Sequence, residues 1–514
     1  MKRNLYLMLG LLLAFACCDP IDTPTPPSGG ENDSTIVDRD TVNWGDSIVI
    51  PDSVDAVAID VVIDPADDTS YTEEAEEIIK NKEHDDYGDF VENCPASAHV
   101  KVVYADGVAT VTGASGSIST GKAGSVSSGV MAKVTGMHVE VSSTKKDVAF
   151  TLEGTSENGS FKIMDAGDSN KRTHIVLNGL SLVNPKGAAI NIQSSKTMLV
   201  ELVDGTANYL EDGEEYVLNG DEQQKGVFFS EGQLVFNGGG SLTINGHYKH
   251  GIASDDYVRI RNGHFAITSV SDGISTKERF IMYGGVVDIN AGQDGIDVDE
   301  GHVEIGGGVL RVQAVDEALT ASYEGMESVD PYINIKGGFI KLTTTGDKGH
   351  ALRAMSTFAM SGGIVQIVVK GAGSKALMSE GDMSFSGGKV TAFAEGDALY
   401  EDGDLSSSAA IRSKGTLTVR NMVIGAKSTG TGGKGINNVG DVTMINSLVT
   451  IVAIGENHHY GNLDSHSRGV VTDGNLTLDG GALLVKSYDD PLHVGGEQCF
   501  LNDAMYEGYQ IGGR

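Results

Sequence analysis

The sequence has few positive charges for its length. Its 514 residues include 37 Lys and Arg against 71 Asp and Glu, which gives a formal net charge of −34. A surface that binds phosphate groups needs an excess of positive charge, so this balance argues against nucleic acid or an anionic membrane surface as a partner. An acidic polysaccharide would need cations between its charges and those of the chain.

Long apolar runs are also missing, apart from one at the start of the chain. A basic pair, an apolar run from Leu5 to Phe15 and small residues before Cys17 are typical of an export signal. The stretch before Cys17 resembles a bacterial lipobox, although the lipobox favours Leu where this chain has Ala14. We expect lipidation at Cys17 and a location in the cell envelope, at the outer membrane or the cell surface. A secretory signal cleaved nearby, with Cys17 incidental, is the alternative.

Cysteines are scarce, with four in the whole chain. An exported protein meets oxidising conditions, so Cys94 and Cys499 are able to form a disulfide there. Their spacing alone does not decide whether they pair.

Familiar catalytic and nucleotide-binding motifs are absent from the sequence. It contains no G-x-S-x-G, no H-E-x-x-H and no Walker loop. Gly430, Gly432 and Gly435 have the G-x-G-x-x-G spacing, but no helical pattern follows them, so we interpret them as loop glycines.

A repeat organises the middle of the chain. His250, Asp272, Asp294 and Glu317 each precede a Gly or Ala and an aliphatic residue, and these openers recur every 22 or 23 residues. A repeat of this length with Gly-rich corners indicates a solenoid, in which no unit buries its apolar face alone. The 69 glycines of the chain agree with many tight corners.

Each repeat contains three short alternating runs. In the unit after His250 the apolar residues are Ile252, then Val258 and Ile260, then Phe265 and Ile267. Alternation of this kind is typical of half-buried strands. We therefore predict an all-β fold, a single-stranded right-handed parallel β-helix with three strands in each coil of about 22 residues. Coils stack at ~4.8 Å, so equivalent residues form columns.

Two of these columns are acidic. The first contains Asp272, Asp294 and Glu317 below His250, and the second contains Asp256, Glu278 and Glu300. Carboxylates about 5 Å apart repel each other by about 3 kcal/mol at an effective dielectric of 20, and Ca²⁺ takes oxygen ligands of this type. Solvated surface acids are the alternative. The predicted calcium ligands are Asp255, Asp256, Asp272, Asp294, Asp297, Asp299, Glu300 and Glu317.

The composition divides the chain into five parts. We predict a lipoprotein signal peptide at 1–17, a Pro- and Ser-rich flexible tether at 18–51, an acidic segment at 52–97, the β-helix at 98–490 and a C-terminal tail or cap at 491–514. Longer intervals between the later openers predict loops that leave the coil corners and build a binding face.

The run from Gly226 to Ser269, followed by DGI and DGID, resembles the bacterial family of carbohydrate-binding domain-containing lipoproteins. The resemblance covers about residues 98–490. It implies a pectate-lyase-like parallel β-helix that holds calcium between its coils and binds cellulose-like or pectic glycans. The implied ligands include Asp255, Asp256, Asp272 and Asp294, and the pattern departs from the family after Asp294.

Three functions remain open. The first is a non-catalytic, calcium-binding, polysaccharide-binding protein, which we expect to be a monomer. The second is a calcium-dependent lyase acting on uronate glycans, with Lys277 as the base. The third is a structural or adhesin β-helix. Aromatic rings stack on sugars through their flat apolar faces, and the candidates are Tyr257, Tyr283, Tyr323 and Tyr460.

Overall fold

The structure is a computed structural model, which describes residues 77–164, 172–218, 220, 222–323, 325 and 329–513. All of them belong to a unit formed by residues 48–514. The predicted signal peptide, Cys17, the tether and the acidic segment up to residue 76 lie outside the described residues. None of the helices in the described ranges has the length and apolar character that a membrane span needs.

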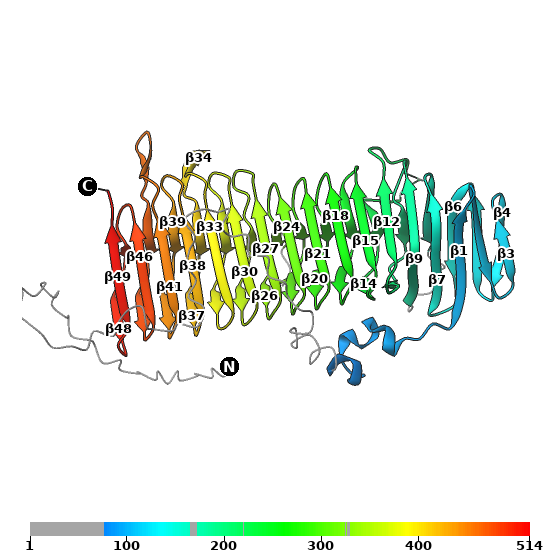
Figure 1. Cartoon of the computed structure of the whole chain (residues 1–514), viewed down its shortest axis with the longest axis horizontal. Helices are drawn as coiled ribbons and strands as arrows, with labels where there is room; N and C mark the ends of the chain where they lie inside the picture. The colour runs from blue at the N-terminus through cyan, green and yellow to red at the C-terminus, as the bar shows by residue number, and fades with distance from the viewer. Residues whose placement is uncertain are drawn as a thin grey trace, which may run out of the picture. The chain divides into compact units, whose positions relative to one another are not determined.

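The described chain is a parallel β-helix with three strands in each regular coil (Figure 1). Equivalent strands of successive coils pair in parallel with a constant register, so that Ile252 pairs with Ile274 and Ile274 with Ile296. The predicted fold class and the three-strand coil are confirmed. We call the three sheets first, second and third, in the order in which each coil visits them.

The first sheet contains β8 (Gly159–Met164), β10 (Ile190–Gln193), β13 (Gly226–Ser230), β16 (His250–Ser254), β19 (Ile274–Thr276), β22 (Ile296–Val298), β25 (Leu319–Ala321), β28 (Leu352–Ala354), β31 (Lys375–Ser379), β36 (Ala409–Ser413), β39 (Lys434–Asn438), β44 (Arg468–Thr472) and β47 (Leu492–Val494).

The second sheet contains β7 (Val148–Ser156), the start of β9 (Arg172–Asn184), β11 (Thr197–Leu202), β14 (Leu234–Asn237), β17 (Tyr257–Ile260), β20 (Arg279–Met282), β23 (His302–Ile305), β26 (Ile333–Ile335), β29 (Phe358–Met360), β32 (Met383–Phe385), β37 (Leu417–Arg420), β40 (Val442–Ile445), β45 (Leu476–Asp479) and β48 (Gln498–Leu501).

The third sheet contains the end of β9, β12 (Ala207–Asp212), β15 (Ser241–Gly246), β18 (His264–Ser269), β21 (Val286–Ala291), β24 (Val309–Ala314), β27 (Phe339–Thr344), β30 (Ile364–Val369), β33 (Lys389–Ala394), β38 (Val423–Ser428), β41 (Leu448–Ala453), β46 (Ala482–Ser487) and β49 (Met505–Gln510).

Aliphatic and aromatic ladders fill the interior of the coils. In the first sheet the buried ladder runs through Ile252, Ile274 and Ile296, and in the second Val258 pairs with the buried Phe280. Because every coil contributes equivalent side chains, the core grows with each repeat rather than closing around one centre.

Glycines allow the coils to pack closely at two positions. A Cβ at Gly273 would lie 2.3 Å from the Cγ2 of Ile289, so the Gly of the Asp-Gly-Ile opener is needed for contact with the third sheet. Gly285, at the corner between β20 and β21, has a φ of 82°, which favours glycine. This corner agrees with the Gly-rich corners predicted for the repeat.

The N-terminal end of the stack differs from the prediction of parallel coils from residue 98. Strands β1 (Ala98–Ala105), β2 (Val108–Gly113) and β3 (Gly116–Ser119) pair antiparallel, and so do β4 (Lys122–Ser127), β5 (Val130–Thr135) and β6 (Met137–Ser143). Parallel pairing begins where β1 meets β7 and β6 meets β8. These antiparallel strands cover the open end of the first coil with backbone that is already paired.

The C-terminal end forms a further coil. Strands β47, β48 and β49 pair in parallel with β44, β45 and β46, so residues 492–510 continue the stack where we had expected a tail or cap. Two antiparallel hairpins leave the last coils, β34 (Leu399–Glu401) with β35 (Asp404–Ser406) and β42 (His458–Tyr460) with β43 (Leu463–Ser465). Both hairpins fall where the interval between successive openers is longer than 22 or 23 residues, as predicted for loops that leave the coil corners.

A short N-terminal segment, residues 77–94, packs on the outer face of the second sheet (Figure 1). It contains the 3₁₀ helices η3 (Asp85–Asp89) and η4 (Val91–Asn93). Arg259 of β17 is 0% exposed and contacts Asp86 and Asp89, each at 2.6 Å. Arg261 donates two hydrogen bonds of 2.9 Å to Glu92.

Cys94, at the end of this segment, is a buried free thiol. Its sulfur donates to the carbonyl oxygen of Gly88 at 3.5 Å, and burial raises the pKa of the thiol. The structure therefore does not join Cys94 to Cys499.

Candidate functional site: a carboxylate cluster on the first sheet

The first predicted acidic column is present. Asp272, Asp294 and Glu317 each stand two residues before a strand of the first sheet, and the N–H of Gly273 donates to the carbonyl oxygen of Asp294 at 2.9 Å. The side chains follow the stacking, because Asp272 Oδ1 accepts from the N–H of Asp294 at 3.2 Å and Asp294 Oδ1 accepts from that of Glu317 at 2.7 Å. The carboxylates of Asp272 and Asp294 therefore contact the backbone of the next coil.

Among the described residues, basic side chains contact this column at its two ends. His250 Nδ1 lies 2.9 Å from Asp272 Oδ2, and an Arg353 Nη lies 3.4 Å from Glu317 Oε1. Asp294, between them, has no basic side chain within 4 Å in the described ranges. The middle of the column thus has unbalanced negative charge.

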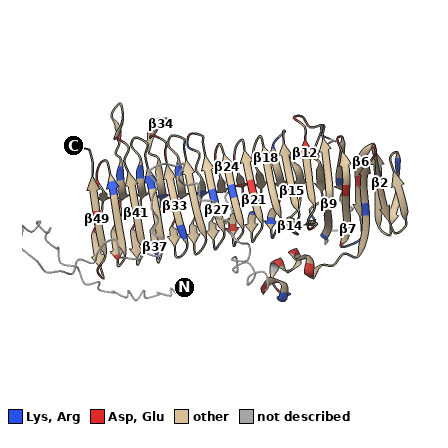
Figure 2. Cartoon of the chain, viewed as in Figure 1, with Lys and Arg blue, Asp and Glu red and all other residues tan. Residues whose placement is uncertain are grey.

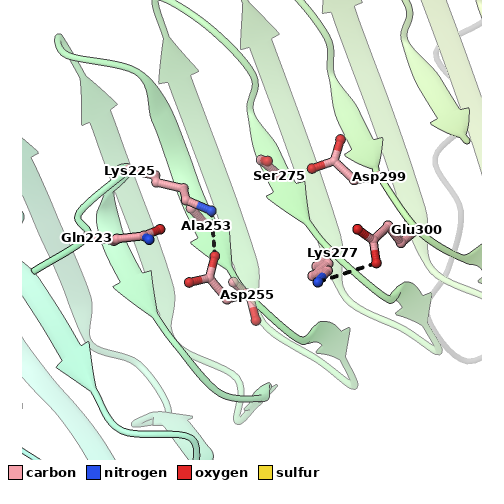
Figure 3. A pocket seen from close by; sticks show the side chains of 9 residues that line it. Gln223, Lys225, Ala253, Asp255, Ser275, Lys277, Asp299 and Glu300 are labelled. Carbon is pink, nitrogen blue, oxygen red and sulfur yellow. Dashed lines mark hydrogen bonds and ion pairs between the residues drawn. The ribbon is translucent and has the colours of Figure 1, made fainter. Parts of the chain in front are cut away.

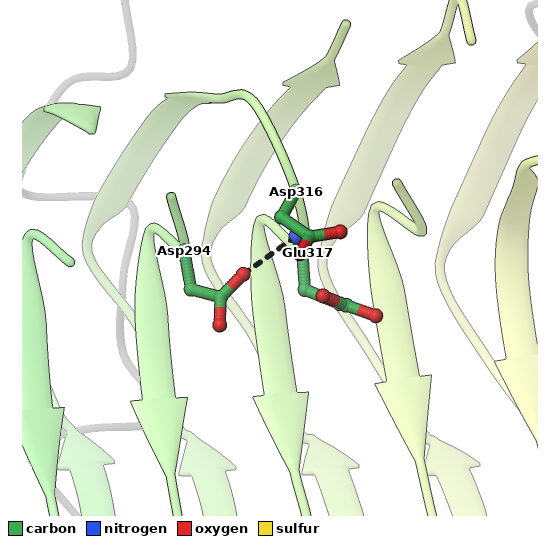
Figure 4. Close-up of side chains that lie close together, drawn as sticks. All are labelled: Asp294, Asp316 and Glu317. Carbon is green, nitrogen blue, oxygen red and sulfur yellow. Dashed lines mark hydrogen bonds between the residues drawn. The ribbon is translucent and has the colours of Figure 1, made fainter. Parts of the chain in front are cut away.

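Three carboxylates converge at this point. Oxygens of Asp294, Asp316 and Glu317 lie within 4.8 Å of one another, as Figure 4 shows. At that separation two ionised carboxylates repel each other by about 3 kcal/mol at an effective dielectric of 20. Asp316 is not among the predicted calcium ligands, because the equivalent positions in the two preceding coils are Ser271 and Gln293 and no acidic repeat marks the place.

The surroundings raise the pKa values of these acids. Burial and the neighbouring Asp272 raise the pKa of Asp294 to about 6. Burial with Asp294 and Asp316 raises the pKa of Glu317 to about 8. Burial with Asp299 raises the pKa of Asp297 to about 9, and Asp294 adds to this shift. The pKa values of Glu317 and Asp297 lie above neutral pH, and a cation held among these acids would favour their ionised forms.

The second predicted column is present at Asp256 and Glu278, where the N–H of Glu278 donates to the carbonyl oxygen of Asp256 at 2.8 Å. Thr276 pairs with Val298 and Arg279 with His302, so the next coil contains one additional residue within 299–301. Burial and Glu278 raise the pKa of Asp256 to about 7. Glu300 lies 3.3 Å from the ammonium of Lys277, so this column is partly neutralised.

A shallow cavity of about 410 Å³ lies on the first sheet beside these columns (Figure 3). Lys225 contacts Asp255 at 2.6 Å on one side of it, and Lys277 with Glu300 forms the other side, next to Asp299. Asp255 therefore pairs with a lysine, and the structure does not bring it into either acidic column. The cavity is polar and carries charges of both signs.

The predicted sugar-stacking tyrosines are placed differently from one another. Tyr257 and Tyr283, expected to be exposed, are 6% and 3% exposed because they lie beneath the N-terminal segment or beside Arg259. Tyr257 donates a hydrogen bond to Asp89, which fixes it in the core of that contact. Tyr323 is partly exposed, and Tyr460 is 50% exposed on the β42–β43 hairpin. Of the four tyrosines, Tyr460 has the largest exposed fraction.

The fold and the site define a parallel β-helix protein with carboxylates gathered on one outer face. The family model for "Carbohydrate-binding domain-containing protein" matches residues 135–398, which is more than half of the chain. The chain therefore belongs to this family. The matched residues include the whole carboxylate cluster.

Two individual proteins show the extent of the similarity. A carbohydrate-binding domain-containing protein of Acetivibrio thermocellus is 30% identical over 130 residues, which are 25% of this chain and 44% of that relative. The match thus spans less than half of the relative's length. The solved structure of the polysaccharide lyase-like protein from C. thermocellum, a gadolinium derivative, has a TM-score of 0.41 and 23% identity, covering 57% of this chain and 99% of that one.

Proposed function

We propose that this chain is a non-catalytic polysaccharide-binding protein of the cell envelope that holds Ca²⁺ in the carboxylate cluster of its first sheet. Family membership over residues 135–398 supports a carbohydrate ligand. The ligand class is a cellulose-like or pectic glycan. The observation that carries the proposal is the convergence of Asp294, Asp316 and Glu317 within 4.8 Å, inside the matched stretch.

The donor set fits a hard cation. The convergent groups offer only carboxylate oxygens, and Ca²⁺ prefers several oxygen ligands, including backbone carbonyls. Asp294, Asp316 and Glu317 would hold one ion, with Asp272, Asp297 and Asp299 as neighbouring donors. A bound calcium ion would neutralise the cluster and coordinate oxygens of a glycan.

The residues around the cluster suit a polar ligand. Lys225 and Lys277 line the adjoining cavity together with Ser275 and Asp299, so hydroxyl and carboxylate groups both find hydrogen-bond partners there. The cavity is open to solvent along the coil stack, which suits a chain-like ligand better than a small enclosed one.

Co-sedimentation of the full chain with insoluble cellulose and with a pectate gel tests this function. We expect retention on at least one glycan in calcium, and a tenfold or greater loss of affinity in Asp294→Asn/Glu317→Gln. Asp106→Asn/Asp503→Asn is the matched control, because both aspartates are exposed and lie outside the columns and outside the two hairpins. Equal retention of all three proteins in calcium and in chelator would contradict the calcium-dependent part of the proposal.

A uronate lyase is the second candidate, and one observation favours it. The ammonium of Lys277 lies in the cavity beside carboxylates that are candidate calcium donors, which is the pairing of base and cation that β-elimination needs. A lyase would release unsaturated uronate, detected by its ultraviolet absorbance, and Lys277→Ala would abolish that product. Retention without product identifies a binder, and neither retention nor product identifies a structural or adhesin β-helix.

The envelope location rests on the sequence around Cys17. Labelling of the expressed protein with a fatty-acid analogue tests it. We expect incorporation in the wild type and none in Cys17→Ala. A secreted, unlabelled wild-type protein would favour the alternative of simple export.

A further inference from the structure

The column that begins with carboxylates becomes basic toward the C-terminal coils. Below Glu317 the backbone hydrogen bonds place His350 and then Lys375, and the strand register continues through Ala409 to Lys434 and Arg468. Lys and Arg recur along the strands of these C-terminal coils (Figure 2). The charge of one outer face therefore reverses along the stack.

Lys375 and Lys434 of this column, and Arg412 of the neighbouring strand β36, donate hydrogen bonds to neutral oxygens. Lys375 Nζ donates to the carbonyl oxygen of Gly373 and to Ser406 Oγ, both at 2.7 Å. Lys434 Nζ donates to Ser465 Oγ at 3.1 Å, and Arg412 to a backbone oxygen at 3.4 Å. Within the part of the chain that the structure describes, no carboxylate oxygen lies within 4 Å of Lys375, Arg412 or Lys434.

Cations next to this group are paired. Lys348 contacts Glu401, Lys414 contacts Glu380, and Arg468 lies 3.4 Å from Asp490. Acids lie farther away from two of the inner three cations, Asp404 from Lys375 and Glu380 and Asp473 from Arg412. The hydrogen bonds that the three cations donate among the described residues all end on neutral oxygens.

The electrostatic surroundings are unfavourable for these charges in the free protein. Burial and nearby Arg412 lower the pKa of Lys375 to about 8. Burial and nearby Arg468 lower the pKa of Lys434 to about 8. Cations held close together with little water are stabilised by an anion that contacts them jointly.

The β34–β35 and β42–β43 hairpins add an aromatic surface beside Lys375 and Lys434. Ser406 and Ser465, which accept from the lysines, end β35 and β43, the second strands of the hairpins. The rings of Tyr400 and Tyr460, from the first strands, stack with centroids 3.9 Å apart. They are 38% and 50% exposed, so one ring pair stands in solvent beside the basic column.

We propose that Lys375, Arg412 and Lys434, with the Tyr400–Tyr460 pair, form a second glycan-binding site that takes the anionic groups, carboxylate or sulfate, of a charged polysaccharide. Arg412 and Lys434 are partly exposed and reach the ligand directly, while Lys375 lies deeper. The exposed tyrosine rings suit the apolar face of a sugar. This inference relies on the proposed function for the ligand class, but it requires no metal.

Family membership does not assign this site. Arg412, Lys434 and the β42–β43 hairpin lie beyond residue 398, where the family match ends, and the β34–β35 hairpin follows it as well. The carboxylate cluster and the basic site therefore occupy different coils of the same sheet.

Calorimetric titration of the full chain in chelator tests the proposal. The probes are a galacturonic acid oligomer, which carries carboxylates only, a kappa-carrageenan oligomer, which carries sulfates only, and the neutral cellohexaose. We expect one of the two anionic probes to bind, and its affinity to fall at least tenfold in Lys375→Gln/Lys434→Gln and in Arg412→Gln. The anionic probe that binds identifies whether carboxylate or sulfate is recognised.

Lys341→Gln/Lys389→Gln is the matched control, since it removes two charges from the third sheet. Unchanged affinity in the site variants, an equal loss in this control, or no binding of either anionic probe would overturn the proposal. Circular dichroism of each variant verifies folding before titration. Because calcium is absent, failure here leaves the calcium-dependent retention experiment as a separate test of the proposed function.

Discussion

Individual residues at the openers determine what each coil carries on its outer face. Asp272, Asp294 and Glu317 occupy equivalent positions and accept hydrogen bonds from the coil below, whereas Lys375 and Lys434 occupy the same column further along. One structural position thus supports acidic and basic chemistry in different coils, because its side chain points out of the solenoid and the backbone pairing does not depend on it.

A rise of stability at alkaline pH is expected from Lys375, which is buried, and Lys434, which is partly exposed. The folded pKa of Lys375 and Lys434 is about 8, below the unfolded value of about 10.4, so the folded state loses these protons first. Between these values the unfolded state binds more protons, and the free energy of unfolding increases with pH. Denaturant melts from pH 7.5 to 10 measure this.

The Lys375→Met/Lys434→Met variant lacks the two titrating groups, so their contribution to the increase of the unfolding free energy with pH should disappear. We expect a smaller increase in the variant than in the wild type over the same pH range, so that the difference between the two proteins narrows as pH rises. Parallel pH profiles of the two proteins would show that these lysines keep ordinary pKa values.

Replacing Gly273 should destabilise the close packing between neighbouring coils. A Cβ there would lie 2.3 Å from Ile289 Cγ2 and 2.7 Å from the carbonyl oxygen of Gly295, so Gly273→Ala should lose about 1–3 kcal/mol of unfolding free energy. Gly124→Ala is the control, because a Cβ at that position meets nothing within 4 Å. Chemical denaturation of both variants gives the comparison, and equal stability would contradict the packing argument.

At the scale of elements, the sequence predicted the regular coils well and the ends poorly. The coils from β16 onward repeat an opener of Gly or Ala followed by an aliphatic residue, together with period-two runs, and both follow from backbone packing. Strands β1 to β6 show the same alternation but pair antiparallel, and alternation alone carries no strand direction. The last coil opens with Asp490, Pro491 and Leu492. Because Pro491 stands where the other openers have Gly or Ala, the sequence pattern did not predict this coil.

Contacts between segments that are far apart in the chain could not be predicted from the sequence. The burial of Tyr257 follows from its hydrogen bond to Asp89, which is 168 residues away in the chain. Likewise Asp316 joins the carboxylate cluster through coil stacking rather than through a repeated residue type. The two acidic columns were predictable because both positions recur with the coil period.

Docking of the N-terminal segment should depend strongly on a single arginine, Arg259. Arg259 is fully buried between Asp86 and Asp89, and burial raises the pKa of Asp89. Arg259→Met would leave both carboxylates without this cation, a loss of about 3–5 kcal/mol from the docked state. Limited proteolysis should then cleave residues 77–97 at lower protease concentration than in the wild type.

Arg311→Met is the matched control for this experiment. Arg311 pairs with Asp288 at 2.9 Å, but both side chains are about half exposed, so its removal should change stability by less than about 1 kcal/mol. The same protease sensitivity in Arg259→Met and in Arg311→Met would indicate that the segment does not depend on the buried contact.

At the scale of the whole chain, stability is distributed along a stack in which each coil depends on its neighbours. Every regular coil covers the aliphatic ladder of the next, and the antiparallel strands and the final coil lie at the two ends. A solenoid of this kind places a long row of outward side chains on one sheet, which suits an extended polymer as a ligand. The acidic and basic parts of that row contribute different chemistry to the same face.

The central claim is that a cation occupies the carboxylate cluster of the folded protein. The most direct measurement is a thermal melt of the full chain in calcium and in chelator, with Asp272→Asn/Asp294→Asn and the control Asp106→Asn/Asp503→Asn. Because a ligand that binds only the folded state stabilises it, by about 2.7 kcal/mol at one hundred times its Kd, calcium should raise the melting temperature of the wild type and the control. The column variant should show no rise. An identical melting temperature of the wild type in calcium and in chelator would contradict the account.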